Sequence, residues 1–311
     1  MINDFTQSFA LEYAGARTKF RATASDLGGV LSEYRHPTAT GPDGQGLFID
    51  VARLGDVGAP LQLVVVSGTH GLEGLSGSAA RIGWIKSGFA HGLPSNVSVL
   101  LVHALNPFGF AHNTRTTENN VDLNRNLFPL GTNFGGSQRE WSNLALETIV
   151  ADHLGAAERI GFIDWHTGIG GWSESFFLCF NDEGGPLHDE AVRWWGRDRI
   201  IGQKPHSLAR PNYQGQVFHG LTKFLAGRPM VGAVIEFGTR GINVHRALQL
   251  DLWLKFKAEK DSERVRLLKA DLQDCFVPVS SHWRESTTGQ AISITQQAVE
   301  GLASWSLAVA A

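Results

Sequence analysis

The sequence predicts an α/β fold in which a mostly parallel or mixed central β-sheet is covered by helices on both faces. Short apolar runs of strand length recur along the chain, and they alternate with segments of helix length. No internal repeat, low-complexity linker or break in composition interrupts the 311 residues. Residues 1–311 are therefore expected to form a single domain.

The first expected element is an amphipathic helix over residues 5–20, because aromatic residues recur there at near-helical spacing. The Gly- and Pro-containing stretch "HPTATGPDGQG", residues 36–46, is typical of a turn region. Five apolar runs rich in Val, Ile or Phe then predict buried strands. They are "LQLVVV" (61–66), "VSVLLV" (97–102), "IGFIDW" (160–165), "FFLCF" (176–180) and "VGAVIEF" (231–237).

Helices are expected between and after these strands. Segments 74–90, 138–158 and 186–199 have helix length. Residues 241–272 predict one long charged helix or a pair of helices, and residues 295–310 predict a closing helix.

The composition excludes several classes of protein. The chain is 42% apolar and 18% charged, as in globular proteins, and its net charge of −3 comes with scattered Lys and Arg. We therefore expect neither nucleic-acid nor membrane binding. The two cysteines, Cys179 and Cys275, are too few for a disulfide framework, and no leader pattern is visible. These features favour a cytoplasmic location; the oligomeric state stays open.

Polar residues that follow the predicted strands are the candidates for function, because ligands bind at the carboxyl ends of strands in such sheets. His70 and Glu73 follow the first run on a Gly-rich turn. They either bind a metal, or they cap or pair within the turn, and this stretch alone leaves both interpretations open. A second pair of the same spacing, His282 and Glu285, has no strand before it and is interpreted as surface.

His166 favours the metal interpretation. It ends a predicted strand with Asp164 and is followed by glycines. Two histidines and a carboxylate, joined by a short and a long spacer, are typical of catalytic zinc. The alternative for His166 alone is an ordinary core histidine.

Two more segments indicate a peptidase rather than another zinc protein. Arg115, Asn124 and Arg125 lie within eleven residues, and guanidinium groups bind carboxylates or oxyanions, although a solvated loop could also hold them. Glu236 lies inside an apolar strand, where burial raises the pKa of a carboxyl group toward that of a general base.

The ordered set of His70-x-x-Glu73, "NPFGF", Arg115, "VDLNRN", "DWH" and "IEFG" resembles the zinc carboxypeptidase family. Within it, "ALEYAGARTKF" and "SGTHGLEGLSGS" also resemble an uncharacterised bacterial branch known mainly as a domain of unknown function, so the likeness spans nearly the whole chain. The related desuccinylases and aspartoacylases share the zinc ligands and the Asn-Arg pair.

The resemblance implies a zinc carboxypeptidase-like fold and a role for each motif residue. It implies that one Zn²⁺ per chain is bound by His70, Glu73 and His166, and that Asp122 orients the first histidine. Glu236 corresponds to the general base and Arg115 to the group that stabilises the oxyanion.

The resemblance also implies a clamp, which here means the residues that bind a terminal carboxylate of the substrate. Asn124 and Arg125 match the residues that bind this carboxylate, and Tyr213 is the counterpart of a mobile tyrosine, or else an ordinary loop residue. The expected reaction is hydrolysis of a C-terminal peptide or amide bond, with deacylation of an N-acyl amino acid as the alternative. A serine hydrolase built on "GLSGS" (74–78) and a non-catalytic zinc module are less favoured.

Overall fold

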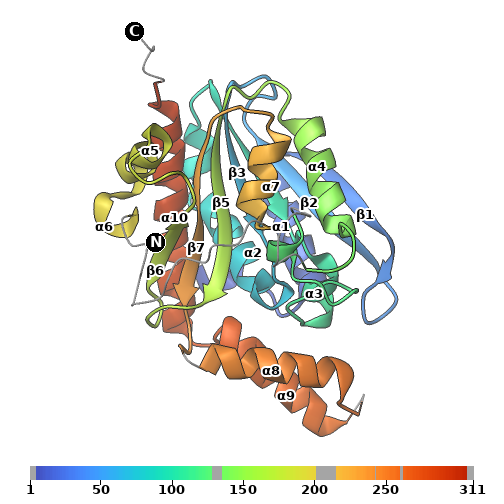
Figure 1. The fold of residues 1–311 in the computed structure, drawn as a ribbon. Helices are drawn as coiled ribbons and strands as arrows, with labels where there is room; N and C mark the ends of the chain where they lie inside the picture. Colours follow the sequence, from blue (N-terminus) through green and yellow to red (C-terminus); the bar gives the residue numbers. More distant parts are fainter. Residues whose placement is uncertain (1–4, 128–134, 201–214, 242, 260–261, 307–311) are drawn as a thin grey trace.

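The computed structural model describes residues 5–127, 135–200, 215–241, 243–259 and 262–306. In this part of the chain seven strands form one mixed sheet in the order β1-β2-β4-β3-β5-β7-β6 (Figure 1). The four central strands are parallel, whereas β1, β2 and β6 pair antiparallel. The strands are β1 (Val30–Thr40), β2 (Gly46–Leu54), β3 (Leu61–Ser67), β4 (Val97–His103), β5 (Arg159–Gly168), β6 (Ser175–Cys179) and β7 (Met230–Gly238).

Helices cover both faces of the sheet, as predicted. Figure 1 shows α4 and α7 in front of the strands and α2 and α10 behind them. The α-helices are α1 (Tyr13–Asp26), α2 (Gly74–Lys86), α3 (Pro107–His112), α4 (Trp141–His153), α5 (Pro186–Trp195), α6 (Arg197–Ile200), α7 (Val217–Phe224), α8 (Asn243–Phe256), α9 (Glu263–Phe276) and α10 (Ser281–Ala303). Short 3-10 helices are η1 (Phe5–Ser8), η2 (Gly71–Glu73), η3 (Phe89–Gly92) and η4 (Leu123–Arg125).

The alternation of side chains along β3 explains why two helical layers are needed. Leu63 and Val65 pack into the cluster that includes α1, α2, α5 and α10. Val64 and Val66 point to the other face and pack into the cluster with α4 and α7. Because successive strand side chains alternate between faces, an apolar run such as residues 61–66 must be covered on both sides.

The five predicted strands correspond to β3 to β7, but the N-terminal predictions were partly wrong. The first helix begins at Tyr13, after the short η1, and not at residue 5. Residues 36–46 are not all turn, because β1 continues to Thr40. Neither β1 nor β2 was predicted. On β1 exposed and covered residues alternate, so this edge strand carries no continuous apolar run.

The C-terminal predictions were closer. The predicted segment 241–272 forms the helix pair α8 and α9, of which α9 continues to Phe276, and the pair lies beyond the carboxyl ends of β5 and β7 (Figure 1). The closing helix α10 begins at Ser281, earlier than residue 295, and carries His282 and Glu285 exposed on its surface. Among the described helices, none combines the length and apolar character required to span a membrane.

Candidate metal centre and active site

The parallel strands bring the predicted site residues to one edge of the sheet. β3 and β5 pair in register, and β5 pairs with β7 so that His166 lies directly beside Glu236. His70 follows β3 after a turn in which Gly68 has a left-handed backbone, with φ of 69°. Three chain segments far apart in sequence therefore meet at the carboxyl end of the sheet.

The turn after β3 is compact because two glycines meet there. A Cβ atom on Gly71 would lie 1.9 Å from the carbonyl carbon of Gly109, so only glycine fits at this position. Neither His70 nor Glu73 caps the helix that it precedes. Of the alternative roles expected for this pair, capping was therefore wrong, whereas His70 and Glu73 do contact each other within the turn.

The side chains of His70, Glu73 and His166 converge and are all buried. His70 Nδ1 lies 2.8 Å from Glu73 Oε1, and His166 Nδ1 lies 2.9 Å from Glu73 Oε2 and 3.2 Å from His70 Nδ1. Tetrahedral zinc ligands about 2.0–2.1 Å from the ion lie roughly 3.3 Å apart. The donor set and spacing thus fit Zn²⁺ after the side chains part by a few tenths of an ångström.

Both imidazoles are oriented by a carboxylate behind them. His70 Nε2 lies 3.2 Å from Asp122 Oδ1, and His166 Nε2 lies 2.8 Å from Asp164 Oδ2. A carboxylate only accepts hydrogen bonds, so each Nε2 carries a proton and each Nδ1 can be the metal ligand. Thr69 Oγ1 in turn donates to Asp164 at 3.0 Å.

Asp164, for which the sequence predicted no role, is the carboxylate that orients His166. The signal was available: Asp164 precedes His166 by two residues on β5, and residues two apart in a strand share a face. The sequence pattern does not determine the rotation of the His166 ring, and this rotation decides whether Nε2 lies within hydrogen-bond distance of the Asp164 carboxylate.

The charges of the centre are mutually dependent. Burial raises the pKa of Glu73, but the charges of His70 and His166 outweigh it and hold that pKa well below its usual range. Burial likewise opposes protonation of His166, yet Asp164 and Glu73 hold its pKa well above the usual range. The buried carboxylates of Glu73 and Asp164 therefore favour a positive charge between them, as a proton or as a metal ion.

Glu236 is a buried carboxylate close to this centre. It is 8% exposed, and its Oε2 has no hydrogen-bond partner among the described residues. Burial, helped by the nearby carboxylate of Glu73 and opposed by the charge of His166, raises the pKa of Glu236 to about 7. A carboxyl group with a pKa near neutrality is suited to accept and return a proton.

Asp122 joins three parts of the site. Besides contacting His70, its Oδ2 accepts hydrogen bonds from Arg115 Nε at 3.1 Å and Nη2 at 3.0 Å. Its Oδ1 also accepts from the backbone N–H of Asn124 at 2.9 Å. Arg115 Nη1 lies 3.6 Å from Glu73 Oε1, so the guanidinium is beside the metal ligands.

Of the three residues expected to bind a terminal carboxylate, two lie in the described part of the chain. Asn124 is buried in η4, and its Oδ1 accepts from Val217 N at 3.1 Å, which leaves Nδ2 as the donor end of the amide. Arg125 is half-buried, and its Nη1 donates to the carbonyl of Asn124 at 2.9 Å. Tyr213 lies outside the described residues.

The serine alternative has little support in the geometry. Ser76 and Ser78 lie inside helix α2, beyond the turn that joins it to β3, and both are buried. Ser78 does contact His103 Nε2, at 3.1 Å, but His103 is fully buried and burial lowers its pKa well below the usual range. This pair packs within the core.

Sequence comparison identifies one family. A family model described as a protein of unknown function (DUF2817) matches residues 9–130 and 127–290. No curated protein matches the chain.

Solved structures share the fold at low sequence identity. A metallo-carboxypeptidase from Burkholderia cenocepacia aligns with a TM-score of 0.55 and 15% identity over 91% of this chain and 69% of that chain. A Pseudomonas aeruginosa metallo-carboxypeptidase in complex with (2-guanidinoethylmercapto)succinic acid aligns with a TM-score of 0.53 and 15% identity. The alignment covers 92% of this chain and 68% of that chain. Bovine thrombin-activatable fibrinolysis inhibitor, in complex with tick carboxypeptidase inhibitor, aligns with a TM-score of 0.54 and 11% identity. The alignment covers 95% of this chain and 97% of that chain. The likeness is that of a zinc carboxypeptidase fold.

Proposed function

This chain belongs to the DUF2817 family and has the zinc carboxypeptidase fold, and from that premise we propose that it is a zinc-dependent hydrolase of C-terminal peptide or amide bonds. The observation that carries the proposal is the pairing of His166 with Glu236 across β5 and β7. It sets a metal-ligand triad beside a buried carboxylate whose Oε2 has no hydrogen-bond partner among the described residues. A site that only stored a metal would have no use for such a carboxylate.

In the proposed reaction His70, Glu73 and His166 hold one Zn²⁺ per chain. Bound zinc lowers the pKa of a coordinated water to about 7 and polarises a carbonyl group. Glu236 takes the proton from the attacking water and delivers it to the departing amine. Its pKa of about 7 suits both transfers.

Arg115 stabilises the negative charge that develops on the carbonyl oxygen. Asp122 holds the guanidinium through Nε and Nη2, so the side chain is already oriented before substrate arrives. The Nη1 group, on the side of Glu73, is the donor that we assign to the oxyanion.

Asn124 and Arg125 bind the terminal carboxylate of the substrate. The Nδ2 group of Asn124 supplies one donor and the guanidinium of Arg125 supplies charge. The compound in the Pseudomonas aeruginosa structure is a succinic acid derivative, which agrees with a ligand that carries carboxylates. A peptide and an N-acyl amino acid both present this group, so deacylation is the second candidate.

A substrate panel tests the proposal. Zinc-loaded protein is assayed with peptides that have a free or an amidated C-terminus and with N-acyl amino acids, each with and without a chelator. We expect chelator-sensitive release of a C-terminal amino acid from free-acid peptides. Faster cleavage of N-acyl amino acids would assign the deacylase instead. Chelator-insensitive hydrolysis would favour the serine alternative, and zinc binding without turnover of any substrate would favour a binding module.

A further inference from the structure

The α8–α9 helix pair contacts both loops that carry the candidate site. Gln273 on α9 donates from Nε2 to the carbonyl of Leu72, the residue before the metal ligand Glu73, at 2.9 Å. Lys255 on α8 donates from Nζ to the carbonyl of Thr117 at 3.0 Å. The pair therefore binds the site loops through polar contacts at two places.

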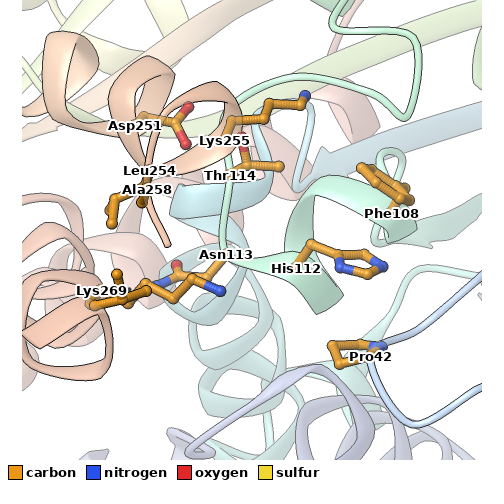
Figure 2. A pocket seen from close by; sticks show the side chains of 11 residues that line it. Pro42, Phe108, His112, Asn113, Thr114, Asp251, Leu254, Lys255, Ala258 and Lys269 are labelled. Atoms are coloured by element: carbon orange, nitrogen blue, oxygen red, sulfur yellow. Dashed lines mark hydrogen bonds between the residues drawn. The ribbon is translucent and has the colours of Figure 1, made fainter. Parts of the chain in front are cut away.

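Apolar packing does not fill the space between this pair and α3. A cavity of about 440 Å³ lies there, between Phe108 and His112 of α3 and Val265 and Lys269 of α9. Figure 2 shows Asp251 on one side of this cavity, with Thr114 of the loop nearby. The pair is anchored to the core by apolar residues such as Leu272 and Phe276, and the polar contacts add to its attachment where the cavity interrupts the packing.

Asp251 makes the contact closest to the proposed chemistry. It is 4% exposed, and its Oδ2 accepts a hydrogen bond from the backbone N–H of Arg115 at 3.0 Å. Burial raises the pKa of Asp251, while the Arg115 N–H and the Lys255 ammonium oppose that shift. A buried carboxylate is costly to hold without such partners.

The backbone of Arg115 is held from the opposite side as well. Its carbonyl accepts from Gly71 N and from Asn106 Nδ2, both at 3.3 Å. The peptide groups on either side of the Arg115 Cα are thereby fixed, one by α8 and the other by the turn that carries the metal ligands.

We propose that Asp251 is a positioning residue for Arg115, through which the α8–α9 pair sets the distance between the guanidinium and the metal ligands. The catalytic consequence rests on the proposed function, whereas the structural link does not. Without the Asp251 acceptor, the Arg115 N–H is buried without a partner and the loop moves to hydrate it. Displacement of an oriented catalytic group by about 1 Å can cost up to roughly 10²-fold in rate.

The test uses three variants of the full-length protein. Asp251→Ala removes the acceptor, Asp251→Asn retains an oxygen that can accept from the Arg115 N–H, and Asp271→Ala removes an exposed aspartate from α9 as the matched control. Amide hydrogen exchange of the segment that contains Arg115 is measured first. We expect faster exchange in Asp251→Ala, near-normal exchange in Asp251→Asn, and no change in Asp271→Ala.

Kinetics then separate positioning from general destabilisation. In Asp251→Ala, kcat should fall between about 10-fold and 10²-fold with little change in KM, and Asp251→Asn should recover most of the loss. In an Arg115→Ala background, Asp251→Ala should cause little further loss, because the group that it positions is gone.

Two results would overturn the inference. One is unchanged amide exchange at Arg115 in Asp251→Ala. The other is the same fold-loss of kcat in the presence and in the absence of the Arg115 side chain. If wild-type protein hydrolyses nothing, the proposed function fails, and the exchange measurement still decides whether Asp251 holds the loop.

Discussion

Glu236 combines properties that rarely coexist in a side chain with a purely structural role. It is buried on the last central strand, carries an oxygen without a hydrogen-bond partner among the described residues, and is included in no ion pair there. A structural carboxylate inside a sheet would be paired with an arginine or with backbone N–H groups. The contrast makes Glu236 the residue whose substitution is most informative.

We predict that Glu236→Gln folds, binds zinc normally and loses activity. Glutamine preserves the volume and removes the proton acceptor, so turnover should fall by roughly 10²–10⁴-fold. Turnover, zinc content and melting temperature are measured on the same sample. A folded, zinc-loaded variant with near-normal turnover would exclude Glu236 as the general base.

Comparison of wild type with Glu236→Gln should also reveal how the stability of the metal-free protein depends on pH. The folded pKa of Glu236, about 7, lies above its ordinary value of 4.5, so this group's stabilising contribution is complete below pH 4.5 and is lost as the pH rises through 7. Between pH 5 and pH 8, metal-free wild type should therefore lose more stability than Glu236→Gln. Melting curves at the two pH values measure the difference, and an equal loss in both proteins would contradict the raised pKa.

Arg125 is predicted to discriminate between free and blocked substrate ends. A charge-assisted hydrogen bond is worth roughly 1.5–3 kcal/mol, and only a free carboxylate can form it. In Arg125→Ala, kcat/KM should fall by about 10-fold to 10²-fold for free-acid substrates and little for amidated ones. Equal losses on both would remove Arg125 from the clamp.

At the scale of the element, strand β5 supplies both a candidate ligand and the group that orients it. His166 and Asp164 project from the same face, and the pairing of β5 with β3 and β7 brings them to His70 and Glu236. The strand thus acts as a rigid support in which the imidazole can present only Nδ1 to a metal.

We predict that Asp164→Asn weakens zinc binding and that His166→Ala abolishes most of it. Loss of an orienting carboxylate typically costs about 10-fold to 10²-fold in metal affinity. Competition with a zinc indicator measures affinity, and elemental analysis measures content. His282→Ala, which alters an exposed histidine of α10, is the control and should match wild type. Wild-type zinc content in His166→Ala would mean that another residue completes the ligand set.

For the whole molecule, the three candidate ligands come from segments that only the folded sheet brings together. His70 and His166 are 96 residues apart, yet their Nδ1 atoms lie 3.2 Å apart. Zinc should bind the native state far more tightly than the unfolded chain, since a preformed site rarely exists in unfolded chains.

Zinc is therefore predicted to stabilise the protein and to release protons on binding. At 100 times the dissociation constant the stabilisation amounts to about 2.7 kcal/mol. The raised pKa of His166 favours its protonated form in the metal-free state, and its Nδ1 must lose that proton to coordinate. Calorimetry in buffers of different ionisation enthalpy should show release of about one proton. Absence of both effects would argue against a metal at this triad.

The local pattern of the sequence was sufficient for the central strands and for the metal candidates. Strands β3 to β7 are continuous apolar runs, and a buried run is recognisable without knowledge of its neighbours. The order of His70, Glu73 and His166 after such runs was enough to predict that they meet, because parallel strands end at one edge. That residues 1–311 form a single domain stays a prediction.

The tertiary structure alone decided the edge strand β1, its neighbour β2 and the groups that orient the site. The edge strand β1 is mostly exposed, polar and contains a proline, so its sequence resembles a loop, and its identity comes from pairing with β2, which in turn pairs with β4. Asp251 is 136 residues from Arg115, and no periodicity links them. Such contacts depend on how helices pack across the end of the sheet, so they emerge only when long-range packing fixes side-chain rotamers and distances.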